Sequence, residues 1–108
     1  MVRKLNNASQ QIWDQISAGR KFLLDGATGT YLQKNGLEPG GCPELMNLHS
    51  PDTIKKMADT YYSNGSDIAL TNTFGGNYYR LRHYGFESEV YKINKAAAKL
   101  TFSSSKKF

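Results

Sequence analysis

The sequence has very few of the residues that build covalent or metal-held scaffolds. Its 108 residues include one cysteine, Cys42, and two histidines, His49 and His83. A single cysteine excludes an internal disulfide framework and cannot alone form a structural zinc site. The histidines lie in unrelated contexts without ligand spacing, which favours surface or core roles for both. We therefore expect no metal site built from this chain's own residues.

Long apolar runs are also missing. No stretch approaches the roughly 20 apolar residues that cross a bilayer, and the basic start of the chain is not followed by the apolar segment of a secretory signal. These absences predict no membrane partner and a cytoplasmic location. Acidic residues number 9 against 14 basic ones, a net charge of +5. Because the basic residues are scattered as pairs, solvated helix faces explain them better than a nucleic-acid surface.

Helical periodicity marks three longer segments. Residues 8–18 predict an amphipathic helix, with Trp13 beside its apolar stripe and at the rim of a core. Ser50-Pro51-Asp52 supplies a hydroxyl N-cap, a first-turn proline and an acid, so a helix begins there and ends at Asn64-Gly65. A further helix is predicted over residues 86–100.

Shorter segments complete the helical pattern. Residues 29–35 and 78–84 predict short helices, and residues 37–48 contain proline and glycine and predict a loop. The tail, residues 101–108, is rich in serine and lysine without periodicity, and we expect it to be unstructured.

Two short apolar runs, residues 21–25 and 67–71, predict buried strands. Strand, helix, strand and helix in this order imply a right-handed parallel βαβ unit and an α/β fold. Parallel strands need cover on both faces and further neighbours. The sequence therefore predicts the beginning of a longer α/β domain.

Both predicted strands end in small and polar residues, which parallel pairing would bring together. Asp25 could face an ammonium group, and the N–H groups of Gly26 and Ala27 a carboxylate, while Asn72 and Thr73 add neutral hydrogen bonds. That set suits a small zwitterion. Helix capping and turn formation explain each residue singly, but they explain the pairing less well.

An ordered series of motifs resembles the homocysteine S-methyltransferase domain family, most closely the N-terminal barrel of the cobalamin-dependent methionine synthases. The resemblance covers about residues 20–100. Its motifs are Asp25-Gly26-Ala27-Thr28-Gly29-Thr30, Pro43-Glu44-Leu45-Met46-Asn47-Leu48, Ser50-Pro51-Asp52, Gly65-Ser66-Asp67-Ile68, Thr71-Asn72-Thr73-Phe74-Gly75 and Ile93-Asn94-Lys95-Ala96-Ala97-Ala98-Lys99-Leu100.

The resemblance implies the first two strand–helix units of a TIM (β/α)8 barrel, truncated, with an N-terminal helix. Residues 1–100 would form this portion of a homocysteine-binding barrel and residues 101–108 its unstructured tail. Members transfer a methyl group to the thiol of homocysteine, held as a thiolate by zinc, in methionine biosynthesis. The substrate-binding residues would be Asp25, Gly26, Ala27, Asn72 and Thr73. The methyl donor would be a methyl-corrinoid or another compound, with cobalamin acting through other modules.

The sequence also departs from the family. The family's zinc ligands are three cysteines on later strands, and this sequence contains none of them, since Cys42 lies outside that set. We therefore expect no metal ligand and no catalytic residue here, and a methyltransferase fragment that is inactive alone. The alternatives are a small basic binding module without catalysis, or a non-functional truncated product.

Overall fold

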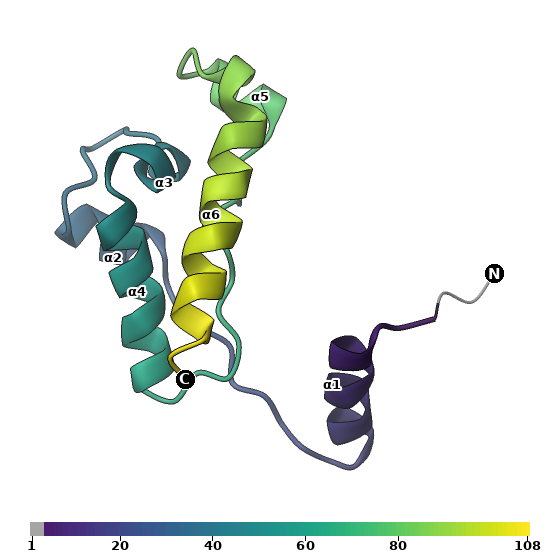
Figure 1. Cartoon of the computed structure of the whole chain (residues 1–108). Coiled ribbons are helices and arrows are strands. Elements are labelled where there is room, and N and C mark those ends of the chain that lie inside the picture. The colour runs from purple at the N-terminus through teal and green to yellow at the C-terminus, as the bar shows by residue number, and fades with distance from the viewer. Residues whose placement is uncertain (1–3) are drawn as a thin grey trace.

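A computed structural model describes residues 4–108, and Figure 1 shows its helices in space. The α-helices are α1 (Asn7–Ser17), α2 (Gly29–Lys34), α3 (Met46–His49), α4 (Pro51–Ser63), α5 (Tyr78–Arg82) and α6 (Val90–Ser105), and the 3-10 turns are η1 (Pro43–Leu45) and η2 (Glu87–Glu89). No helix in this part of the chain is long and apolar enough to span a membrane.

Three of the helices, α1, α4 and α5, begin at a side-chain cap or at a first-turn proline. The side chain of Asn6 accepts a hydrogen bond from the backbone N–H of Ser9 at 2.8 Å and caps α1. Asn77 caps α5 in the same way, because its side chain accepts from Arg80 N at 3.0 Å. In α4 the proline occupies the first turn, and the hydroxyl of Ser50 makes no cap hydrogen bond. The predicted start of α4 is confirmed, although only part of the predicted capping is present.

Two helices, α4 and α6, lie side by side and form the centre of the fold (Figure 1). One buried cluster joins α2, α3 and α4, and a second joins the loop before η1 to α5 and α6. The first contains Leu32, Met46, Ile54 and Met57, and the second contains Cys42, Leu81 and Ile93. Helix-on-helix packing therefore supplies the apolar burial that stabilises the chain.

The predicted α/β fold, with two strand–helix units of a TIM barrel, is wrong for this structure. Residues 4–108 form no strand, and the two predicted strands share one isolated parallel bridge between Leu24 and Ile68. Asp25 N donates to Ile68 O at 2.9 Å, and Asp67 N donates to Leu23 O at 2.7 Å. The two segments are therefore adjacent and parallel as expected, but they do not extend into a ladder.

Carboxylates explain why the ladder stops. Leu23 N donates to the Asp67 side chain at 2.9 Å, and Leu70 N donates to the Asp25 side chain at 3.1 Å, so side chains replace backbone carbonyls on both sides of the bridge. The faces are also uncovered, since Leu23, Leu24 and Leu70 are each more than half exposed. Parallel strands are stable chiefly when both faces are buried, and that condition is not met here.

The N-terminal helix forms as predicted but not in the predicted place. No residue of α1 is buried, and Trp13 is 58% exposed rather than lying at the rim of a core. Figure 1 shows α1 standing apart from the other helices. Its amphipathic stripe is real, and the described part of the chain does not cover it.

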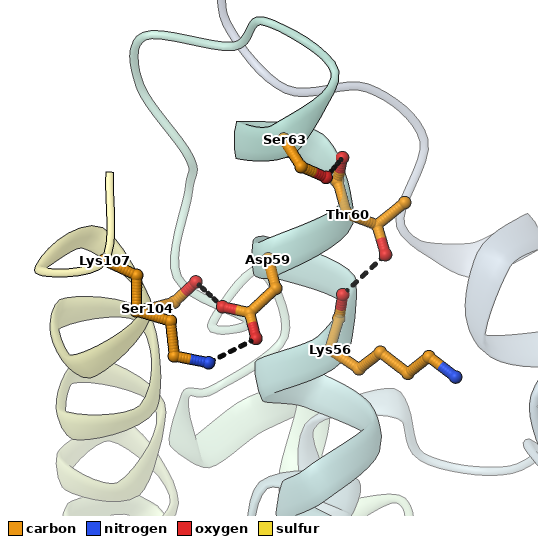
Figure 2. A network of polar contacts seen from close by, with 6 residues as sticks. All are labelled: Lys56, Asp59, Thr60, Ser63, Ser104 and Lys107. Carbon is orange, nitrogen blue, oxygen red and sulfur yellow. Dashed lines mark hydrogen bonds and ion pairs between the residues drawn. The ribbon is translucent and has the colours of Figure 1, made fainter.

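The prediction of an unstructured tail is also wrong. Helix α6 continues to Ser105, because Thr101 and Ser104 are buried. Figure 2 shows the side chain of Asp59 on α4 accepting hydrogen bonds from the Ser104 hydroxyl and from Lys107 Nζ, the latter at 3.0 Å. The ring of Phe108 stacks on that of Tyr62, with 5.6 Å between the ring centroids. Polar pairing, which apolar periodicity cannot reveal, anchors this end of the helix.

The environment of Asp59 sets its charge. Burial acts to raise the pKa of its carboxyl, but the hydrogen bond from Ser104 and the Lys107 ammonium outweigh burial and hold the pKa below its ordinary value. A lowered pKa in the folded state means that the ionised carboxylate stabilises the fold at neutral pH. This contribution is lost as the pH falls below the ordinary carboxyl pKa and through the folded-state pKa.

We predict that Asp59→Asn destabilises the chain by about 1–2 kcal/mol at pH 7, because a charge-assisted hydrogen bond and an ion pair are lost. Urea unfolding followed by circular dichroism measures this difference. The gap to the unsubstituted chain should close in acid, where Asp59 is protonated. Asp14→Asn on the exposed face of α1 is the control, and an equal effect of both substitutions at pH 7 would contradict the assignment.

Candidate functional site

An open hollow of about 360 Å³ lies where the start of α2 faces the segment of residues 70–74. Thr28 and Gly29 border it on one side, and Pro43 and Glu44 of η1 border it on another. The hollow is the place where the small and polar residues that follow the two predicted strands come together. It is the candidate site of this chain.

Two of the five predicted site residues, Asn72 and Thr73, line the hollow. The hydroxyls of Thr71 and Thr73 share a hydrogen bond of 2.8 Å, so either hydroxyl can act as donor. A hydroxyl pair of this kind can reorient toward a ligand that needs a donor or an acceptor. The role predicted for Thr73 remains a prediction, and its position is compatible with that role.

The other three predicted residues lie next to the hollow and make structural contacts. The carboxylate of Asp25 accepts from Leu70 N, and the carbonyl of Ala27 accepts from the hydroxyl of Tyr61 at 2.5 Å. Gly26 packs against the same tyrosine, since a Cβ there would lie 3.1 Å from the Tyr61 ring. The structure thus brings the two predicted segments together but orients the first one partly toward α4.

Asn72 is buried and joined to Asn47 by reciprocal hydrogen bonds. Its side-chain nitrogen donates to Asn47 Oδ1 and to Pro43 O, both at 2.9 Å. The side-chain nitrogen of Asn47 in turn donates to Asn72 O at 2.9 Å and to Ile93 O at 3.2 Å. This amide pair fixes one wall of the hollow to η1, α3 and α6.

Glu44 is a buried carboxylate that the sequence reasoning did not identify as a site residue. Its Oε1 accepts from Gly75 N at 2.6 Å, and its Oε2 lies 3.6 Å from the Cys42 thiol, which donates to it. The only sequence signal was its place in a family motif, because its partner Gly75 lies 31 residues further along the chain. Residues paired over such separations leave no local pattern.

The single thiol is unsuited to nucleophilic chemistry. Burial raises the pKa of Cys42, and the neighbouring Glu44 carboxylate raises it further, while backbone hydrogen bonds from Leu45 and Glu44 act in the opposite direction. A raised pKa keeps the thiol protonated at neutral pH, whereas the thiolate is the reactive and metal-binding form.

Residues 4–108 contain no group of three His, Cys, Asp or Glu side chains placed to hold a metal ion. Cys42 and Glu44 supply only two adjacent donors, and they already bond to each other. A zinc ion that activates a thiol needs at least three protein ligands and one open position. The zinc site implied by the family resemblance therefore does not fit the described residues.

Comparison with known proteins identifies relatives of this chain. The family model described as homocysteine S-methyltransferase matches residues 22–108. The match therefore includes residues 101–108, which lie beyond the resemblance seen in the sequence. A methionine synthase from Mycobacterium leprae is 34% identical over 104 residues. That alignment covers 85% of this chain but only 8% of the relative's length.

We predict that Asn72→Ala lowers the free energy of unfolding by about 1–3 kcal/mol, because Pro43 O and Asn47 Oδ1 would lose a buried donor. Urea unfolding measures the loss. Asn35→Ala is the matched control, since the exposed Asn35 side chain donates only to Tyr31 O. If the two substitutions cost the same, the buried amide pair does not carry the role assigned to it.

Proposed function

The chain belongs to the homocysteine S-methyltransferase family, and on that premise we propose that its hollow binds the amino-acid end of homocysteine. The observation that carries the proposal is that the family match spans both segments bordering the hollow, from residue 22 onward. The chain covers a small part of the methionine synthase that it resembles. We therefore propose methyl transfer in methionine synthesis as the activity of longer family members, and substrate binding as the role of this chain.

The groups around the hollow suit a zwitterion. The nitrogen of Asn72 is occupied by two acceptors, which leaves its side-chain oxygen to accept from an ammonium group. The carboxylate of Asp25, bonded to Leu70 N, places a negative charge near the same edge. The N–H groups of Gly26 and Ala27 would face the substrate carboxylate, and Thr73 would add a hydroxyl.

We propose that this chain binds substrate without catalysing methyl transfer by itself. Transfer needs the homocysteine sulfur as a thiolate, which attacks the donor's methyl carbon while the bond to the donor breaks. In the family a zinc ion binds the homocysteine sulfur and holds it as the thiolate. The described residues offer no three-ligand set and a protonated thiol, so we assign no catalytic residue here. A methyl-corrinoid or another methyl donor would be supplied by other modules.

Binding is tested by titrating the 15N-labelled chain with L-homocysteine under reducing conditions. We expect amide shifts at residues 26–29 and 71–75. Thr73→Val should weaken binding about tenfold, because a hydrogen bond to a charged ligand is lost. Thr60→Val on α4 removes a hydroxyl that donates only to Lys56 O, and it should leave the affinity unchanged. Amides that do not move at millimolar homocysteine would overturn the proposal.

Inactivity is tested separately. The purified chain, given zinc, homocysteine and a methylated donor, should form no methionine above a protein-free blank when products are measured by mass spectrometry. Methionine formation that depends on the chain would show that it holds a catalytic group we have not recognised.

A further inference from the structure

We propose that Glu44 is a positioning residue, whose buried carboxylate fixes the turn of residues 73–76 and thereby shapes the wall of the hollow. The inference rests on the proposed function for its consequence in binding, but its structural basis is independent. Glu44 is neither part of the Leu24–Ile68 bridge nor one of the five predicted site residues.

The turn has few other anchors. Gly76 N donates to Thr73 O at 2.9 Å within the turn, and the side chain of Asn94 donates to Gly76 O at 2.7 Å. The side chain of Phe74 is fully exposed and holds nothing in place. The hydrogen bond of 2.6 Å from Gly75 N to Glu44 is therefore the contact that joins the tip of the turn to η1.

The fit between the carboxylate and the turn is close. A Cβ added at Gly75 would lie 2.7 Å from Glu44 Oε1, closer than real Cβ contacts allow, and 3.1 Å from its carboxyl carbon, which is tighter than most. Glu44 is only 6% exposed, so it cannot swing freely into solvent. The Glu44 carboxylate can therefore keep this position only because residue 75 has no side chain.

The chemistry also favours a carboxylate at this position. A backbone N–H bonded to a charged oxygen makes a shorter and stronger hydrogen bond than one bonded to a neutral carbonyl. The second oxygen accepts from the Cys42 thiol, which fixes the rotation of the carboxyl group. Glutamine keeps the oxygen facing Gly75 but loses the charge, so it provides a graded test.

The experiment compares Glu44→Gln and Glu44→Ala with Glu38→Ala, an exposed carboxylate outside the site. Amide hydrogen exchange and homocysteine affinity are measured on each. In Glu44→Ala, exchange at Gly75 should accelerate at least tenfold while exchange at Ile54 in α4 is unchanged, and the Kd should rise about tenfold. In Glu44→Gln both changes should stay within about threefold, and Glu38→Ala should show neither.

The two proposals fail in different ways. If the unsubstituted chain does not bind homocysteine, the proposed function fails, and Gly75 exchange alone decides the role of Glu44. Unchanged exchange at Gly75 in a folded Glu44→Ala chain overturns the positioning role. So does faster exchange with an unaltered Kd, because the turn would then not shape the site.

If Glu44→Ala does not fold, Glu44→Asp replaces it, since the shorter side chain withdraws the carboxylate from Gly75 and keeps the charge. Gly75→Ala should then lower the urea midpoint less in the Glu44→Asp background than in the unsubstituted chain. Equal losses in both backgrounds would overturn the inference.

Discussion

The buried amide pair of Asn47 and Asn72 is the interaction on which the arrangement of the fold depends. One hydrogen bond joins the two side chains, and three more reach Pro43 in η1, the backbone of Asn72 and Ile93 in α6. Removing either side chain would leave several buried carbonyl or amide groups without partners, and each such loss is costly in a low-dielectric interior. The pair therefore fixes how three parts of the chain meet, whereas the apolar clusters supply bulk stability.

The candidate site follows from that junction. Asn72 faces the hollow on one side and the interior on the other, so the binding surface is attached to the most constrained polar network in the chain. Glu44 holds the adjoining turn from the same 3-10 segment whose Pro43 carbonyl accepts from Asn72. A ligand that bonds to this wall would meet groups whose positions are already fixed, which lowers the ordering cost of binding.

The longer helices could be predicted from sequence because they depend on local patterns, whereas η1 and most of α3 lie within residues 37–48, for which a loop was predicted. The start of α4 at Pro51 and the amphipathic stripe of α1 both follow from residues that are close together in the sequence. The prediction of two strands was wrong, because a parallel ladder needs neighbouring strands that residues 4–108 do not provide. The last turn of α6 was missed because Ser104 is buried by pairing with Asp59, 45 residues away. At the candidate site, Asn72 and Thr73 carry a local sequence signal and line the hollow. Glu44 and Asn47 acquire their contacts only through partners far along the chain.

The isolated bridge between Leu24 and Ile68 has a consequence for the order of folding. Joining Leu23 to Asp67 closes a loop of about 44 residues, and the length-dependent entropy of that closure is roughly 3 kcal/mol. Three backbone and two side-chain hydrogen bonds join the segments at the bridge and return about 1 kcal/mol each. Ordering the backbone of the paired residues costs a further ~1–2 kcal/mol per residue, so the pairing is not favourable by itself. It becomes favourable only once α2 and α4 have packed and shortened the effective loop. We therefore expect the bridge to form after the helices have packed and not to act as the folding nucleus.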